Sequence, residues 1–259
     1  MTSTFTSPPP GDPPLPARET LPSMYDLPSE YPEEPGLADE FHIWQPQILL
    51  LTFKPPKCDR DRVFSAADMN VYYNSSHPLW HKRPDWFAAI DVPRFYGEEQ
   101  DLRLSYVCWQ EPVNPFIVVE LLSPSSEDED LGNTTRKPGE PPTKWEVYEQ
   151  ILRIPYYFIF SRYTNELQAF QLVGGRYQRV ALTDGRLVIP QIGLSLGLWQ
   201  GTYQGCDRLW LRWRTLDGEL ILLPQEEATV AREEANLANQ KAAKLAAKLQ
   251  ELGIDPTEI

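Results

Sequence analysis

The stretch that decides the fold is Phe116-Ile117-Val118-Val119-Glu120-Leu121-Leu122, which lies between Pro115 and Pro124. All of its residues except the glutamate are apolar. A short apolar run rich in β-branched residues is typical of a central strand covered on both faces. An ionised carboxylate inside such a strand is costly unless a cation or a proton accompanies it. Glu120 therefore predicts a partner group and is the first candidate site residue.

A second carboxylate borders another apolar run. Asp85 follows Pro84 and directly precedes Trp86-Phe87-Ala88-Ala89-Ile90. An aspartate after a proline can simply cap a turn. Together with Glu120, it can instead be one of two carboxylates that hold a divalent metal ion. Both interpretations of Asp85 are compatible with the sequence.

A helix and a further strand are predicted after Glu120. Thr143 and Glu146 have the spacing of a capping box, which predicts a helix from 143 to about 152. The apolar run 155–160 then predicts a strand, so that strand, helix and strand form a parallel unit with a right-handed connection. Lys144 lies on the first turn of this helix, where its long side chain can lean toward the edge of the sheet. Such a lysine can also be an ordinary solvated residue.

The segment between Glu120 and Lys144 leaves two questions open. The run 127–130, Glu-Asp-Glu-Asp, is most simply a solvated loop, with Asp130 as a minor site candidate. Residues 131–143 contain glycine and several prolines, which favour a surface loop. That loop contains Lys137, an alternative source of the lysine.

These segments resemble the Uma-type restriction endonucleases, a family abundant in cyanobacteria. The resemblance covers about 36–219 and depends on matches in this order: Pro84-Asp85, Val118-Val119-Glu120, Ser123-Pro124-Ser125, Asp130, Lys144, Tyr148 and Pro155-Tyr156-Tyr157. It implies a restriction-endonuclease-like α/β fold of the PD-(D/E)XK type, with the lysine moved from the strand to the following helix. Many nucleases of that fold add a glutamate from an early helix, for which Glu40 is the match here.

The resemblance implies an endodeoxyribonuclease that hydrolyses DNA phosphodiester bonds with Mg²⁺ or Mn²⁺. Asp85 and Glu120 would ligate the metal ion, and Lys144 would stabilise the transition-state charge or help to activate water. The long segment 131–143 departs from the family pattern. It keeps open an alternative function, a catalytically inactive nuclease-fold protein that acts as a binding or assembly module through its tail.

The chain divides into three parts by composition. Residues 1–35 hold ten prolines and many acids and are predicted to be a disordered leader. Residues 36–223 are predicted to form the nuclease-like domain, with a helix near 37–51 that Pro46 must kink or divide. A strand is predicted over 102–109, and an antiparallel extension with a Gly174-Gly175 hairpin turn follows residue 160.

Residues 224–259 are predicted to form a helical tail. Val230, Leu237, Leu245, Leu249 and Leu252 form only a narrow apolar stripe on it, which is too thin to predict a coiled coil. The sequence does not determine the oligomeric state, and a homo-oligomer is compatible with it.

The net charge of −13 is concentrated in the flanks. Residues 1–40 hold one base and eight acids, and residues 224–259 hold four bases and seven acids, whereas the core 41–223 holds 19 bases and 22 acids. A nearly balanced core with local basic clusters, such as 54–62 and 81–83, can contact a DNA backbone without binding it tightly and nonspecifically.

Compartment and metal type follow from a few further features. No apolar run reaches the ~20 residues of a membrane span, and the N-terminal residues lack the pattern of a signal peptide. Three distant cysteines, Cys58, Cys108 and Cys206, indicate a reducing, cytoplasmic compartment. They do not combine with His42, His77 or His81 into the spacing of a zinc site, and these histidines receive no role.

Overall fold

The computed structural model describes residues 39–123, 126–136 and 139–251. The predictions for residues 1–35, Lys137 and Leu252 therefore lie outside the described residues. Within those three ranges, none of the helices combines the length and the apolar character needed to cross a membrane.

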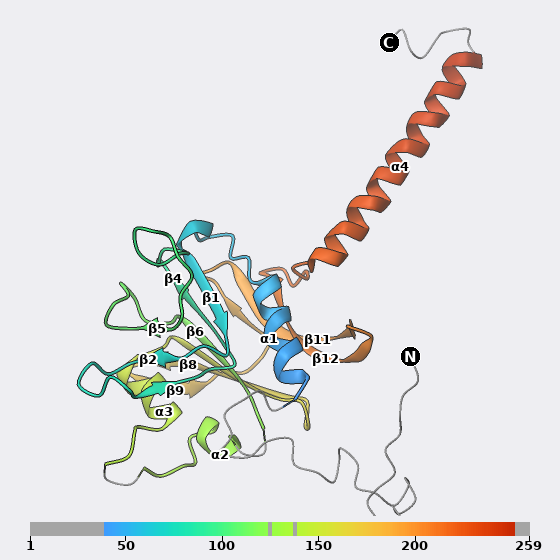
Figure 1. Ribbon diagram of the computed structural model, residues 1–259. Helices are drawn as coiled ribbons and strands as arrows, with labels where there is room; N and C mark the ends of the chain where they lie inside the picture. The colour runs from blue at the N-terminus through green and yellow to red at the C-terminus, as the bar shows by residue number, and fades with distance from the viewer. Residues whose placement is uncertain (1–38, 124–125, 137–138, 252–259) are drawn as a thin grey trace, which may run out of the picture.

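A six-stranded mixed sheet forms the centre of the protein (Figure 1). Its strand order is β1-β4-β6-β7-β8-β9, and only β6 and β7 run parallel. The strands are β1 Val63–Ala67, β4 Trp86–Ile90, β6 Ile117–Leu121, β7 Tyr156–Ser161, β8 Glu166–Val173 and β9 Arg176–Arg179. Every residue of β6 is buried, which confirms the central strand predicted around Glu120.

The connection from β6 to β7 contains short helical segments: α2 Glu127–Asp130, α3 Lys144–Glu146 and a π-helical turn, η3 Val147–Ile151. The predicted capping box is present, because Glu146 N donates to Oγ1 of Thr143 and Thr143 N donates to Oε2 of Glu146. The predicted regular helix to residue 152 is wrong in one respect. After Glu146 the backbone widens to π-helical geometry, a distortion that occurs often at functional sites.

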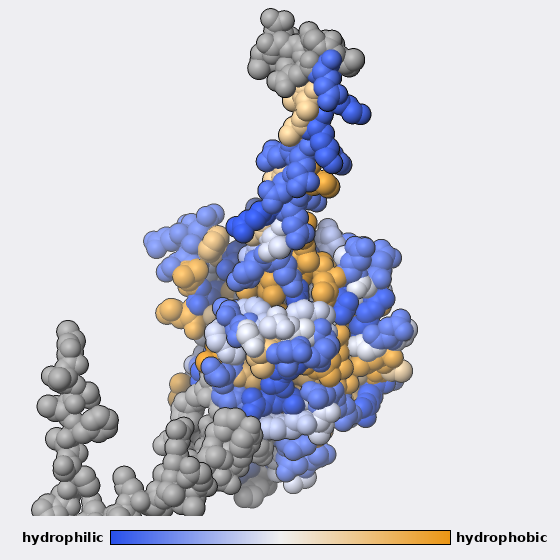
Figure 2. All heavy atoms as spheres, turned by 90° about the vertical axis from the view of Figure 1, so that its right-hand side faces the viewer, coloured by the Kyte–Doolittle hydropathy of each residue, from blue (hydrophilic) through white to orange (hydrophobic). Residues whose placement is uncertain are grey.

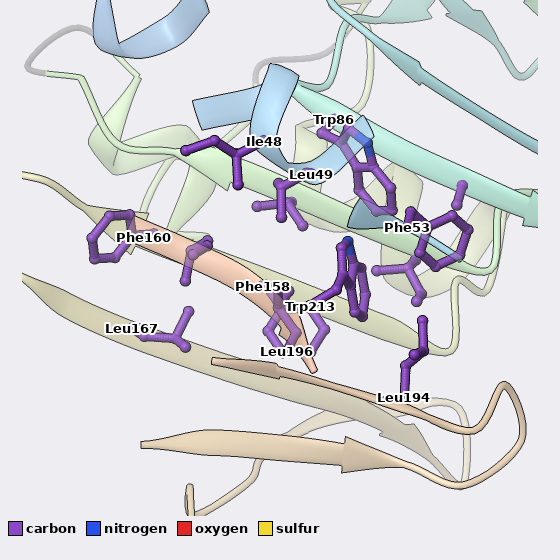
Figure 3. Close-up of a cluster of buried hydrophobic side chains, with 14 of the residues drawn as sticks. Ile48, Leu49, Phe53, Trp86, Phe158, Phe160, Leu167, Leu194, Leu196 and Trp213 are labelled. Carbon is purple, nitrogen blue, oxygen red and sulfur yellow. The ribbon is translucent and has the colours of Figure 1, made fainter. Parts of the chain in front are cut away.

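One face of the sheet packs on α1 Phe41–Thr52 and on a second, antiparallel sheet of β10 Arg186–Ile189, β11 Leu194–Tyr203 and β12 Cys206–Thr215. Figure 3 shows their apolar side chains meeting between the two sheets. Pro46 lies inside α1 without dividing it. The Gln45 side chain exchanges two hydrogen bonds with the Leu211 backbone, so that β12 holds the helix next to the proline.

The other face carries a second apolar cluster, to which η3 contributes Val147 and Tyr148. A small sheet, β3-β2-β5, lies beside it and consists of β2 Val71–Tyr72, β3 His81–Lys82 and β5 Tyr106–Val107. Of the strand predicted over 102–109, only β5 is present. Arg103 turns inward instead and donates to the carbonyls of Pro93 and Arg94 and to Glu111, which ties this segment to loops rather than to a ladder.

The last described element is the helix α4 Pro224–Glu251. Figures 1 and 2 both show it standing clear of the rest of the protein. A 3₁₀ turn, η2 Arg60–Arg62, precedes β1, and the Gly174-Gly175 turn joins β8 to β9 as predicted. The predicted α/β class with a mixed sheet, an antiparallel extension and a C-terminal helix is confirmed.

Candidate functional site

The register of β4 against β6 places the two predicted carboxylates opposite one another. Trp86 pairs with Val119 in this antiparallel ladder, so the next position along brings Asp85 across from Glu120. Two hydrogen bonds continue the ladder through side chains. Leu121 N donates to Oδ2 of Asp85 at 2.7 Å, and Asp85 N lies 3.4 Å from Oε2 of Glu120. Asp85 is therefore fixed at the end of β6 rather than capping an isolated turn.

The Glu120 side chain is fully buried and has two further partners. The hydroxyl of Tyr148 donates to its Oε1 at 2.8 Å, and the ammonium of Lys144 lies 3.2 Å from its Oε2. Burial raises the pKa of Glu120 well above 4.5, the nearby acids Asp130 and Asp85 raise it further, and Lys144 lowers it. The cation demanded by the sequence is thus present.

Lys144 reaches Glu120 because the capping box starts the helix one residue before it. Its backbone N–H donates to Oε1 of Glu129 at 3.0 Å, and its ammonium lies 2.7 Å from Oδ1 of Asp130. Burial alone would lower the pKa of Lys144, but the charges of Asp130, Glu120 and Asp85 outweigh it and raise this pKa well above 10.5. The lysine is therefore held as a cation between buried carboxylates.

Asp130 is the residue that sequence reasoning undervalued. It was expected in a solvated loop, but it ends the short helix α2 and is completely buried. The hydroxyl of Tyr157 on β7 donates to its backbone carbonyl at 2.9 Å. Gly132 has a φ of +75°, and a Cβ there would lie 2.9 Å from the ring of Trp145. This close packing on α3 brings the inserted segment, and Asp130 with it, to Lys144.

The early helix contributes a histidine rather than the expected glutamate. Glu40 is exposed at the start of α1 and its side chain makes no capping bond. His42 is buried, with Nε2 3.1 Å from the carbonyl oxygen of Leu121 and Nδ1 3.0 Å from Oδ1 of Asp39. Sequence reasoning gave His42 no role. The only signal was its place on the apolar side of the first helix.

Three basic residues around the site are already paired with acids. Lys82 lies 2.6 Å from Oε1 of Glu129, Arg83 pairs with Asp68, and Arg162 pairs with Asp39. His77 stacks on Trp80, and His81 bonds to the carbonyl of Leu79, so neither contacts the carboxylates described above.

The donor chemistry of this site fits a hard divalent cation. Asp85 and Glu120 offer the carboxylate oxygens that Mg²⁺ and Mn²⁺ prefer, and water can complete the shell. With Asp130 there are three carboxyl groups around the ammonium of Lys144, so acidic groups outnumber this cation. The described part of the chain holds no cluster of three or more His, Cys, Asp or Glu side chains already arranged to bind a metal.

Comparison with known proteins places these residues in a family. The Uma2 family model, described as "Putative restriction endonuclease", matches residues 24–205. Among solved structures, a protein titled "putative nuclease belonging to DUF820", from Anabaena variabilis, is similar with 11% identity and a TM-score of 0.38, over 57% of this chain and 68% of that chain. No curated protein matches this chain. Because the family model covers more than half of the sequence, the chain belongs to the Uma2 restriction endonuclease family.

Proposed function

We propose that this protein is a Mg²⁺- or Mn²⁺-dependent endodeoxyribonuclease, in which Asp85 and Glu120 hold the metal ion and Lys144 supplies positive charge beside the scissile phosphate. The observation that carries this proposal is the meeting of Glu120 and Lys144 at the end of β6, with Asp85 directly across the ladder. A bound divalent ion would polarise the phosphate and lower the pKa of a bound water. Membership of a restriction endonuclease family supports DNA as the substrate.

The remaining contacts fix these groups in place. Tyr148 donates to one oxygen of Glu120 and leaves the other toward Lys144. His42 holds the carbonyl of Leu121, whose N–H holds Asp85. Such hydrogen bonds preorganise a site, so that little reorganisation is needed when charge develops in the transition state.

Of the two roles open to Lys144, the geometry favours electrostatic stabilisation over proton abstraction. Its ammonium lies between Asp130 and Glu120, and both carboxylates favour the charged form. A lysine held in that form carries no free lone pair with which to take a proton from water. It can, however, stabilise the negative charge of the pentavalent phosphate.

A catalytically inactive binding module remains the second candidate, because one observation favours it. Lys144 occupies the space between two buried carboxylates, as a purely structural cation would. A buried lysine that pairs with Glu120 and Asp130 can be required for the fold without any chemistry, because its removal would leave two buried carboxylates without a cation. The two candidates differ in whether Glu120 also binds a metal ion.

The test compares the wild type with Glu120→Gln by supercoiled plasmid cleavage in Mg²⁺ and Mn²⁺ and by calorimetric titration of Mn²⁺. Glu149→Gln is the matched control. Glu149 is also buried and lies on η3 in the connection after β6, but its partners are Arg176 and the backbone of Tyr177. We expect Glu120→Gln to lose cleavage by at least ~10²-fold and to bind Mn²⁺ more weakly, with Glu149→Gln like the wild type.

Equal Mn²⁺ binding by wild type and Glu120→Gln would remove Glu120 from the metal site. A wild type inactive with both ions and with linear and supercoiled DNA would favour the binding module.

A further inference from the structure

The helix α4 has no partner along most of its length. Its first turn is fixed to the body, because Glu226 pairs with the buried guanidinium of Arg212 and Glu227 pairs with Lys54. Beyond this turn nearly every described side chain is exposed, including Val230, Leu237 and Leu245 at 41%, 53% and 61%. Figures 1 and 2 show the helix leaving the body from this anchored turn. A rigidly rooted helix thus presents apolar side chains to solvent.

The charges of α4 do not stabilise it as an isolated helix. Between residues 228 and 248, no acidic side chain lies three or four positions from a basic one. Lys244 and Lys248 repel each other at i,i+4. A solvent-exposed helix without such ion pairs usually obtains its stability from packing of one face.

That face becomes clear when the helix is divided into heptads. The alternating spacing of four and three residues selects Ala231, Ala235, Ala238, Ala242, Leu245 and Leu249, which we call the seam. All six are apolar, and they follow the a and d positions of a two-stranded coiled coil. The narrow apolar stripe expected from the sequence mixed seam residues with Val230 and Leu237, which occupy c positions outside the seam. Over ~28 Å the seam is continuous.

The charges beside the seam indicate what covers it. The positions preceding successive a residues are Glu227, Glu234, Lys241 and Lys248, acidic in the first half of the helix and basic in the second. If a second α4 runs antiparallel, with Ala235 level with Ala238 of the partner subunit, then Glu234 faces Lys241 of the partner subunit. Glu227, which also pairs with Lys54 of its own body, is then level with Lys248 of the partner subunit, and both pairs occur twice by symmetry.

A parallel arrangement has less complementarity. In it, Glu227 would face Arg232 of the partner subunit, but Glu234 and Lys241 would face Asn239 of the partner subunit and Ala246 of the partner subunit, which carry no charge. We therefore propose that α4 pairs with α4 of a second copy of this chain as an antiparallel two-stranded coiled coil, with the two nuclease-like bodies at opposite ends. The proposal is independent of catalysis, since it uses no residue of the site around Glu120.

The first test measures the mass of the full chain by light scattering or sedimentation over a concentration series. A double seam variant, Ala238→Glu with Leu245→Glu, is compared with Gln240→Glu with Ala247→Glu, which adds two glutamates on the opposite face of the same turns. We expect the wild type and the opposite-face variant to approach twice 29.8 kDa. The seam variant should remain at 29.8 kDa with an unchanged unfolding transition of the body. A monomeric wild type, or a seam variant that dimerises like its control, overturns the proposal.

The second test determines the direction of pairing. Glu234→Lys places two lysines face to face in the antiparallel pair, so the dimer dissociation constant should rise about tenfold, and Lys241→Glu should act likewise. The double variant exchanges the two charges and should restore wild-type dimerisation. In a parallel pair both residues face uncharged partners, so an absence of effect from the single variants, or of rescue in the double variant, overturns the antiparallel arrangement.

Discussion

The ammonium of Lys144 lies 3.2 Å from Oε2 of Glu120 and 2.7 Å from Oδ1 of Asp130, and both acids are completely buried. One cation thus serves two carboxylates, Glu120 on β6 and Asp130 at the end of α2 in the connection that follows this strand. Burying either carboxylate without it would cost several kcal/mol or force the uptake of a proton. The same contact therefore stabilises the fold and, in our proposal, prepares the catalytic site.

Replacement of Lys144 by methionine separates these two effects. We expect Lys144→Met to fold with a lowered unfolding temperature, because Glu120 and Asp130 lose their common cation and must take up protons. Cleavage should fall by ~10²–10³-fold, the usual effect of losing one transition-state contact. Plasmid cleavage and thermal unfolding are the measurements.

Two further variants distinguish the structural effect of Lys144→Met from its effect on cleavage. Adding Asp130→Asn to Lys144→Met removes one of the two buried charges, so it should recover unfolding temperature but not cleavage. Lys82→Met is the matched lysine control, since Lys82 pairs with Glu129 outside the pair of buried acids. If Lys144→Met cleaves DNA like the wild type, Lys144 has only the structural role.

The central sheet could be predicted because the residue pattern of its strands indicates whether each face is buried. The run 116–122 is apolar on both faces, and only a covered strand accommodates that pattern. The capping box at Thr143 was equally local, so the start of the following helix was correct. The π-helical turn after Glu146 was not predictable, since it depends on how Tyr148 and its neighbours pack against the sheet. The strand expected over 102–109 failed because the tertiary partners of Arg103 outweigh strand propensity.

The candidate site could be predicted in part for a related reason. Glu120 was conspicuous as one charge in an apolar strand, whereas Lys144 became a candidate only through the resemblance to the family, because a lysine on a first helical turn is usually solvated. Asp130 lies in a run of four acids, where the sequence gives no reason to choose one of them. Its burial depends on the packing of Gly132 on Trp145, a contact visible only in three dimensions. His42 likewise contacts the backbone carbonyl oxygen of Leu121, and no sequence pattern indicates such a contact.

The pKa of His42 gives a prediction about that histidine. Burial by itself lowers this pKa, but the hydrogen bond and charge of Asp39 and the charge of Asp85 outweigh it, so the pKa lies above 6.5. A raised pKa means that the charged imidazole stabilises the fold fully below pH 6.5, and that this contribution is lost as the pH rises through the raised value. We expect the imidazole signals, assigned with His42→Gln, to titrate above pH 6.5.

The variant Asp39→Asn tests whether Asp39 raises the pKa of His42. It removes the hydrogen-bonded charge, so the titration midpoint of His42 should fall by NMR, and the loss of stability with rising pH should shrink. His77 and His81 serve as internal references, because neither contacts Asp39. An unchanged midpoint for His42 in Asp39→Asn would contradict the assigned cause.

For Glu226, the predicted dependence of stability on pH has the opposite sign to that of His42. Burial opposes ionisation, but the hydrogen bond from Arg212 and the backbone N–H of Leu223 lower the pKa of Glu226 below 4.5. Its contribution to stability is therefore present above pH 4.5 and is lost as the pH falls through the lowered pKa. We expect Glu226→Gln to unfold at a lower temperature than the wild type at pH 7, with the difference vanishing under acidic conditions. Glu233→Gln, on the exposed part of α4, should show no such difference.

The anchored first turn of α4 also changes where the folded domain should end. A chain of residues 36–223 is the predicted domain, but it lacks Glu226 and leaves the fully buried guanidinium of Arg212 without its carboxylate. The partner that is removed, Glu226, is partly exposed, so solvent screens this ion pair and we expect its loss to cost ~1–3 kcal/mol. A chain of residues 36–230 retains Glu226 and Glu227 but omits the seam.

We expect both shortened chains to be monomeric and to unfold cooperatively, with 36–230 unfolding at the higher temperature. Glu226→Gln within 36–230 should remove most of the difference, as measured by calorimetry. If 36–223 is as stable as 36–230, the pairing of Arg212 with Glu226 contributes nothing to the domain, and the boundary at 223 stands.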